Sequence, residues 1–349
     1  MDSISEKNTI VRYDWLDNIK AFAMGFVIFA HLGLNGFSPF VIMTSFIKLP
    51  LFFAASGFVF NPNKNIKFID YFKTRIQRII VPYLCLSILL ALFDLTNSNV
   101  VFLDWLKSSA SSIATGTTMW FLPTLFICNI AMYLTFKVCK NNDVLIIVTS
   151  IISFVIGYFF ITGKHIFMGI NTVFIAYPMC VFGYYLKSFI LNMNKNILLF
   201  IGIVATILYI GLPLLYRFCN GEINSINMYE SRYSSYFYDM IVSYAGVLAF
   251  FIAFQYIKFP KFVTWFGKNT LFYYAFHIPA CNLTLYILST FISPIFTKGT
   301  LTSSLKYTAI YTIITIILLI LLAPICMAVN KYLPFIVGLK KKKATNKTN

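Results

Sequence analysis

The chain has 349 residues, of which 59% are hydrophobic and only 11% are charged, and it carries a formal net charge of +17. A soluble domain contains about 25% charged residues, and the mean hydropathy here is +0.79, so an ordinary soluble protein is excluded. Apolar runs long enough to cross a bilayer recur along the chain, whereas a β-barrel would show short alternating segments. The composition therefore predicts an all-α polytopic membrane protein.

The apolar runs predict about ten transmembrane helices. Because a span needs about 20 apolar residues, we place them at 16–36, 40–60, 77–94, 118–137, 143–161, 170–190, 196–216, 234–257, 269–291 and 306–330. The longest outer segments, around 95–117 and 217–233, are expected to be loops, which either contact a polar substrate or only connect helices. The predicted domains are a cytoplasmic N-terminal segment (1–15), a transmembrane domain (16–330) and a basic cytoplasmic tail (331–349).

The distribution of Lys and Arg predicts that both termini are cytoplasmic. With the N-terminus inside, 21 of the 28 basic residues fall on the inner side, and an excess of positive charge marks cytoplasmic loops. The net charge then reflects topology and contact with anionic membrane lipid, not binding to nucleic acid. We expect a multi-pass protein of the plasma membrane.

The stretch "YDWLDNIKAFAMGFVIFAHLG", residues 13–33, includes most of the first predicted span, and within that span it carries the ionisable side chains Asp17, Lys20 and His31. Eleven residues on a helix make three turns plus about 20°, so Lys20 and His31 share one face, about 16 Å apart along the axis. Ionisable groups within a span more often line a cavity than face lipid. The alternatives are that Lys20 anchors the helix at the interface and that a neighbouring helix satisfies His31.

A second basic motif lies in "YFKTRIQRIIVPY", at the inner end of the third predicted span. Arg75 and Arg78 are spaced i, i+3, and two guanidinium groups on one helical face suit a phosphorylated ligand. Positive-inside topology also explains basic residues here. We expect both arginines to line one polar cavity with Asp17, Lys20 and His31.

Six segments in a fixed order carry a family resemblance: "LDNIKAFAMGFVIFAHLG", "KLPLFFAASGFVF", "RIQRIIVPY", "TTMWFLPTLF", "YPMCVFGYYLK" and "WFGKNTLFYYAFHIP". Together they resemble membrane-bound acyltransferase family 3, and within it the group similar to fucose 4-O-acetylases. The resemblance extends from about Tyr13 to Val329. It implies an integral membrane O-acetyltransferase that moves an acetyl group from cytoplasmic acetyl-CoA to a hydroxyl of an extracytoplasmic or lipid-linked glycan.

The resemblance also implies roles for individual residues. The family's basic-residue-then-histidine motif falls on Lys20 and His31, and Lys20 replaces the usual Arg. The Arg-x-x-Arg motif falls on Arg75 and Arg78, which with Lys20 would bind the donor's phosphates. Trp120 and His277 fall on motif positions and are candidate substrate-binding residues, with a structural role as the alternative for His277. Lys48 has no assigned role.

The implied chemistry centres on His31. A neutral His31 would act as general base toward the sugar hydroxyl, or alternatively as an acetyl-carrying relay. Asp17, grouped with the catalytic residues, would pair with Lys20 or a nearby arginine. No metal site is expected, because the seven Cys residues show no metal-ligand spacing. A glycan exporter or flippase without acyl-transfer chemistry is the main alternative, and a sensor or scaffold subunit is a third.

Overall fold

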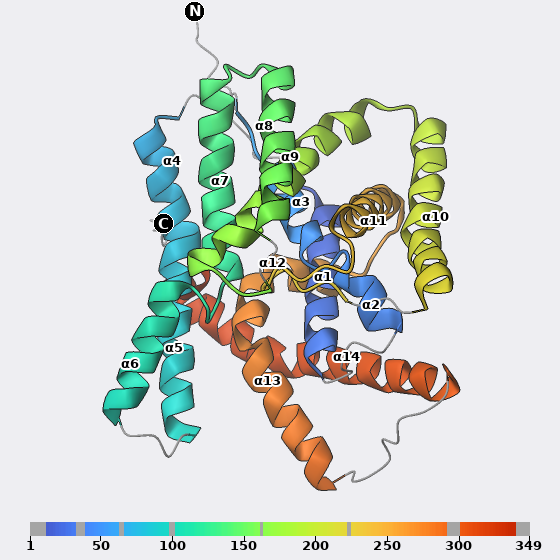
Figure 1. Cartoon of the computed structure of the whole chain (residues 1–349). Coiled ribbons are helices and arrows are strands. Elements are labelled where there is room, and N and C mark those ends of the chain that lie inside the picture. The colour runs from blue at the N-terminus through green and yellow to red at the C-terminus, as the bar shows by residue number, and fades with distance from the viewer. Residues whose placement is uncertain are drawn as a thin grey trace, which may run out of the picture.

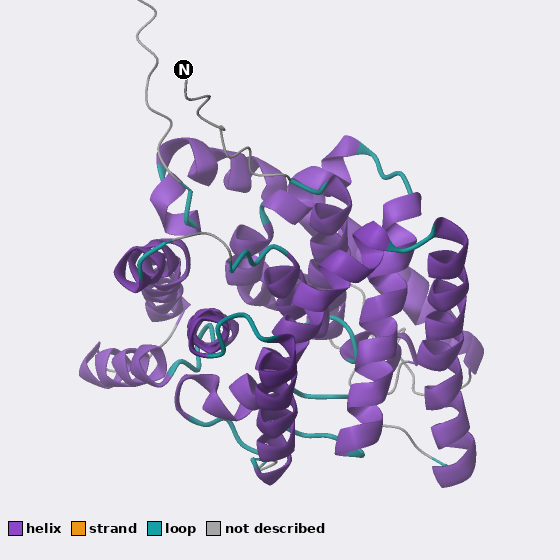
Figure 2. Ribbon diagram, turned by 90° about the horizontal axis from the view of Figure 1, so that it is seen from above, coloured by secondary structure: helices purple, strands orange, loops and turns teal. Residues whose placement is uncertain are grey.

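The computed structural model describes residues 12–32, 39–62, 66–97, 102–160, 163–221, 225–291 and 301–339. For 94–97, 289–291 and 301–307 it describes the backbone alone. Within these residues every regular element is a helix (Figure 2), and one antiparallel bridge joins Asn227 to Arg232. The prediction of an all-α chain is confirmed for this part of the protein.

The helices follow one another with short connections. In chain order they are α1 (Asp14–His31), α2 (Pro39–Ser45), α3 (Pro50–Phe58), α4 (Phe68–Arg75), η1 (Ile76–Ile80), α5 (Val81–Asn97), α6 (Phe102–Thr115), α7 (Phe121–Val138), α8 (Asp143–Phe159), η2 (Phe167–Gly169), α9 (Ile170–Asn192), α10 (Lys195–Asn220), α11 (Tyr236–Tyr256), α12 (Lys261–Lys268), α13 (Thr270–Phe291), α14 (Leu301–Tyr332) and η3 (Pro334–Val337).

Eight helical stretches among the described residues are long and apolar enough to cross a membrane. They are Pro39–Phe58, Phe68–Phe93, Phe121–Val138, Phe167–Asn192, Lys195–Asn220, Tyr236–Tyr256, Thr270–Leu288 and Thr308–Tyr332. The two other predicted spans correspond to α1, which carries several charges, and to α8, which is apolar but 17 residues long. The chain is a multi-pass membrane protein, and the count of ten and the side of each terminus stay predictions.

Helix α1 lies at the centre of the fold. It contacts α2, α3, α11, α12, α13 and α14, and α14 crosses below it in Figure 1. Most of its length is therefore enclosed by other helices, which is how a helix with ionisable side chains is accommodated in an apolar fold. Ile19, Ala23 and Met24 are almost completely buried along it. Residues 33–36 of the predicted first span lie outside the described part of the chain.

Glycines allow the closest helix contacts. A Cβ atom added to Gly57 of α3 would lie 1.8 Å from the carbonyl oxygen of Cys180 in α9, and one added to Gly183 would lie 2.0 Å from that of Ala54. Small residues at both crossings let the two backbones touch, as is common between helices in membranes. Gly267 of α12 packs in the same way against the backbone of Asp17. These contacts fix α3 and α12 against the central helices.

Three predicted elements differ from the observed ones. The span at 40–60 is broken at residues 46–49 into α2 and α3. The outer loop expected around 95–117 contains α6, because "FLDWLKSSASSIAT" places apolar side chains along one side of a helix, and Trp105 Nε1 donates a 3.0 Å hydrogen bond to the carbonyl of Ala91 in α5. The connection before the ninth span, predicted to be on the inner side, contains the short helix α12.

Candidate active site

Two histidines from different helices meet at the end of α1. His31 is the last residue of α1, and His277 lies within α13. Their ring centroids are 4.8 Å apart and their planes meet at 68°. The side chain of His277 is buried, whereas that of His31 is exposed. The contact of the two helices thus builds a pair of imidazoles with one ring enclosed and the other accessible to an approaching group.

The enclosed ring has a defined orientation. Nδ1 of His277 lies 2.6 Å from the backbone carbonyl oxygen of Tyr274. A carbonyl oxygen only accepts hydrogen bonds, so we assign the ring proton to Nδ1. In the neutral ring, Nε2 then carries the lone pair. The Tyr274 ring stacks on that of His277 with 5.6 Å between centroids, which holds the plane of the imidazole.

Lys48 brings a positive charge to this pair. It lies in the turn between α2 and α3, where its amide donates a 2.9 Å hydrogen bond to the carbonyl of Thr44. Its ammonium group interacts electrostatically with both His31 and His277. The family resemblance assigned no role to Lys48, and the sequence did not predict the break between α2 and α3 in which it lies.

A cleft of about 260 Å³ lies between α1, α3, η1, α7 and α13. Its polar lining consists of Lys20, Ser56, Arg78, Thr270 and Tyr274, and its other walls are apolar. An apolar cleft with a few convergent polar groups is the usual form of a small-molecule site.

One end of the cleft lies about one helical turn short of the histidine pair. Val27 lines the cleft four residues before His31, and Tyr274 lines it three residues before His277. One turn of helix rises about 5.4 Å. Each wall therefore ends about one turn short of an imidazole, and a slender ligand in the cleft would approach the pair along α1 and α13.

Lys20 stands away from the histidines and is held by a buried carboxylate. Its Nζ atom lies 2.6 Å from Oδ1 of Asp17, and Nε of Arg12 donates to Oδ2 of the same residue at 2.8 Å. The Asp17 side chain is 5% exposed and that of Lys20 28%, so the carboxylate is enclosed while the ammonium faces the cleft. Asp17 precedes His31 by about 21 Å along the helix, so the structure does not bring these two together.

The two predicted arginines take different directions. Pro82 has no amide hydrogen to bond the carbonyl of Arg78, and the helix widens to a π turn at Ile76–Ile80. A π turn rotates successive side chains by less than an α turn, so the i, i+3 spacing no longer sets both arginines on one face. Arg78 lines the cleft, whereas the Arg75 guanidinium lies over the ring of Tyr71, 4.8 Å from its centroid.

The predicted shared cavity is therefore formed in part. Lys20 and Arg78 line one cleft, and His31 lies one turn beyond its wall on the face that Lys20 and Val27 share. Asp17 pairs with Lys20 but does not line the cleft itself, and Arg75 is not part of the lining either.

Trp120 lies at the edge of the same cleft. It immediately precedes α7, and its ring centroid is 6.3 Å from that of Phe121, which lines the cleft. On its other side the Trp120 ring is 5.7 Å from that of Tyr229, in the segment that follows α10. Trp120 thus joins the cleft to the outer segment predicted around 217–233.

Two further polar residues of the cleft, Ser56 and Tyr274, lie in segments that carry the family resemblance. Ser56, in "PLFFAASGF", accepts a 3.2 Å hydrogen bond from Nδ2 of the buried Asn129 in α7. Tyr274 donates no side-chain hydrogen bond in the described contacts, but its hydroxyl accepts one of 3.3 Å from the amide of Phe121. Both are polar groups inside apolar spans, which is the pattern that marks a functional cavity.

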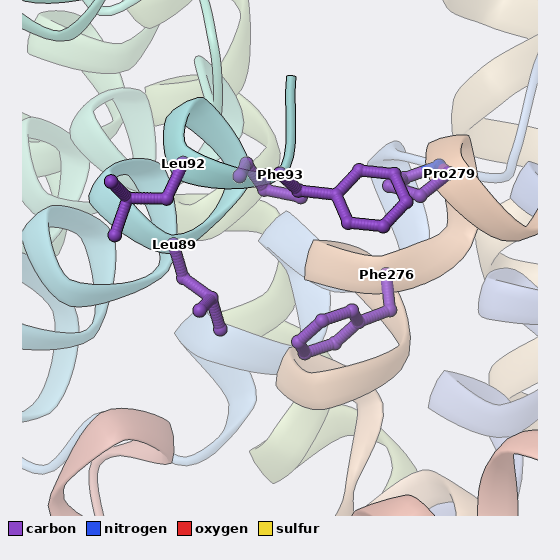
Figure 3. Close-up of a pocket in the computed structure, with 6 residues that line it drawn as sticks. Leu89, Leu92, Phe93, Phe276 and Pro279 are labelled. Carbon is purple, nitrogen blue, oxygen red and sulfur yellow. The ribbon is translucent and has the colours of Figure 1, made fainter. Parts of the chain in front are cut away.

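A second hollow, of about 320 Å³, is apolar. Leu89, Leu92 and Phe93 of α5 face Phe276 and Pro279 of α13 across it (Figure 3). It offers no side-chain donor or acceptor to a ligand. Its apolar lining suits hydrocarbon, and the hollow is not part of the candidate active site.

The comparisons with known proteins identify the family. The family model for the acyltransferase domain of acyltransferase family 3 matches residues 13–326, a range that contains Lys20, His31, Arg78, Trp120 and His277. Comparison with curated proteins and with solved structures returns no match. The matched range covers most of the chain, from the start of α1 into α14. This chain is therefore a multi-pass membrane protein of acyltransferase family 3.

Proposed function

We propose that this chain is an O-acetyltransferase of the plasma membrane. It takes an acetyl group from cytoplasmic acetyl-CoA and transfers it to a hydroxyl of an extracytoplasmic or lipid-linked glycan, as the resemblance to the fucose 4-O-acetylase group implies. The observation that carries the proposal is the cleft itself, which Lys20 and Arg78 line, with Lys20 on α1 at the end away from the His31–His277 pair and the other end about one turn short of that pair. Membership of the acyltransferase family does not favour the alternative of a glycan exporter.

The cationic end of the cleft suits the nucleotide of the donor. Lys20 supplies a point charge and Arg78 a planar guanidinium that binds phosphate in bidentate fashion. The distance of about 16 Å from Lys20 to His31 along α1 is comparable to an extended phosphopantetheine arm. With the nucleotide at this end, the arm fills the apolar part of the cleft and the thioester lies beside the histidines.

His31 then acts as the general base. Its imidazole takes the proton of the sugar hydroxyl while that oxygen attacks the thioester carbonyl carbon. Collapse of the tetrahedral intermediate breaks the carbon–sulfur bond, and the imidazolium returns the proton to the CoA thiolate. The ammonium of Lys48 is suited to stabilise the oxyanion, because a fixed charge in a water-poor site is effective there.

The neighbouring residues position these groups. His277, with its proton on Nδ1 toward Tyr274, packs against the His31 ring and orients it. Asp17 holds Lys20 at the cleft wall and is not a group that touches the reacting atoms. Arg75, directed at Tyr71, contributes less to donor binding than Arg78.

A transfer assay tests this function. The full chain in proteoliposomes is given acetyl-CoA labelled in the acetyl group together with fucose-containing oligosaccharides, and the label is followed into the glycan. We expect incorporation that depends on His31. Labelled enzyme trapped in the absence of acceptor would indicate the acetyl-His31 relay in place of direct transfer. No transfer and no release of CoA from well-folded protein would contradict the proposal.

A further inference from the structure

The segment 225–235, between α10 and α11, is fastened to two other parts of the fold. The amide of Ile226 donates a 3.0 Å hydrogen bond to Oγ of Ser45 at the end of α2. Oγ1 of Thr172 in α9 donates to the carbonyl of Met228 at 2.7 Å. With the Asn227–Arg232 bridge, these bonds hold an irregular segment in a fixed place, so its side chains are presented by a rigid support.

This support carries an aromatic corner made by Trp120, Tyr229 and His165. The rings of Trp120 and Tyr229 have centroids 5.7 Å apart and meet at 54°. On its other side Tyr229 is stacked almost parallel on His165, at 4.5 Å and 14°. Burial lowers the pKa of His165, which favours the neutral form of its ring. All three residues are half-buried, and both ring nitrogens of His165 are enclosed.

The corner continues into the active site through aromatic contacts. Trp120 contacts Phe121, and the Phe121 ring lies 5.5 Å from that of Tyr274. Tyr274 in turn stacks on His277, which contacts His31. The corner and the histidine pair are therefore two ends of one packed aromatic row.

Polar groups lie beside the corner. Nδ2 of Asn227 donates a 2.8 Å hydrogen bond to Oε2 of Glu230, the residue after Tyr229, and Arg232 forms an ion pair with the same carboxylate. Arg232 is exposed. The corner thus combines flat apolar rings with donors and an acceptor at its rim, which is the composition of a site for a ligand that has both an apolar face and hydroxyl groups.

We propose that Trp120 and Tyr229, backed by His165, bind a pyranose ring of the acceptor glycan. One face of a pyranose exposes C–H groups that pack on an aromatic ring, and its equatorial hydroxyls reach a polar rim. Rigid aromatic side chains provide such contact area at low entropic cost. That the bound sugar is then acetylated rests on the function proposed above, whereas the binding does not.

Binding of simple sugars tests the site without the donor. The full chain in phosphatidylcholine nanodiscs is mixed with methyl α-L-fucopyranoside or methyl β-D-glucopyranoside, and with sorbitol, which has hydroxyls but no ring. Saturation-transfer NMR should detect the pyranosides and not sorbitol. Tyr229→Ala should weaken pyranoside binding roughly three- to tenfold, the range expected for one aromatic contact, and Tyr229→Phe should retain it.

A matched control removes an aromatic ring elsewhere. Phe218, near the end of α10, is 88% exposed, and Phe218→Ala should leave pyranoside binding unchanged. Aromatic side chains also anchor proteins at the membrane interface. If Tyr229→Ala lowers the thermal stability in nanodiscs but leaves pyranoside binding unchanged, the corner is a lipid anchor and the proposal is overturned.

Measurement of acetyl transfer distinguishes the sugar-binding proposal from the acetyltransferase proposal. If wild-type protein transfers acetyl groups and Tyr229→Ala leaves the KM for the glycan unchanged, the sugar site is wrong and the acetyltransferase function stands. If the pyranosides bind at the corner but no acetyl group is transferred, the sugar site stands and the acetyltransferase function is wrong.

Discussion

The imidazole rings of His31 and His277 lie 4.8 Å apart, although one ends α1 and the other lies within α13. A base needs a fixed tautomer and direction, and the His277 ring beside His31 is itself fixed by its hydrogen bond to the Tyr274 carbonyl. His277→Ala should therefore lower kcat about 10- to 100-fold and leave the KM for acetyl-CoA unchanged. His277→Gln, which keeps a polar side chain, should recover part of the loss in the same assay. Equal losses for both variants would indicate a packing role only.

The two arginines provide a matched pair. Arg78 lines the cleft and Arg75 lies over Tyr71, so Arg78→Ala should raise the KM for acetyl-CoA about tenfold or more, as expected for loss of a charged hydrogen bond. Arg75→Ala should raise it less. Donor titration at low and high salt measures both, and the effect of Arg78 should shrink with salt as its exposed charge is screened. A larger effect at Arg75 would mean that the family's arginine motif acts differently here.

Variants of Lys20 test whether donor binding needs the planar guanidinium of an arginine or only a positive charge. Its ammonium is held by Asp17 at 2.6 Å. If it contacts phosphate as a point charge, Lys20→Arg should keep or lower the KM for acetyl-CoA, and Lys20→Ala should raise it with little change in kcat. The titration of both variants at matched expression decides this. An unchanged donor KM in Lys20→Ala would return Lys20 to the role of an interface anchor.

Alanine substitutions at two glycines are expected to have opposite effects on stability. Gly57→Ala would drive a methyl group into the Cys180 backbone, and we expect destabilisation of about 1–3 kcal/mol or more, as for overpacked cores. Gly25 in α1 has no atom within 4 Å of an added Cβ, so Gly25→Ala should be neutral or stabilise by up to about 1 kcal/mol. Melting temperatures in detergent compare the two. A stable Gly57→Ala would mean that α3 and α9 do not pack this closely.

Much of the fold and part of the site could be predicted from the sequence. Hydrophobic runs locate most of the long helices, and helical periodicity sets Lys20, Val27 and His31 on one face. The break at residues 46–49 was not predicted, because "VIMTSFIKLPLFF" is apolar throughout apart from Lys48 and its short polar side chains. Only the tertiary structure shows that the charge of Lys48 acts on the two histidines.

The arginine motif and α6 show two other limits. The i, i+3 rule assumes an α-helix, and the π turn before Pro82 separates Arg75 from Arg78. Polar Ser residues in 102–115 favoured a loop, yet the packing of Trp105 on α5 supports a helix there. Both features depend on contacts with other helices, which periodicity within one segment cannot show.

The donor titration of His31→Ala tests the central claim most directly. Initial rates of acetyl transfer are measured in proteoliposomes against acetyl-CoA concentration, for wild type and His31→Ala at matched expression. Because the base acts in the transition state and the nucleotide binds at Lys20 and Arg78, kcat should fall about 10²- to 10⁴-fold and the KM for acetyl-CoA should stay within about twofold. An unchanged kcat would contradict the account.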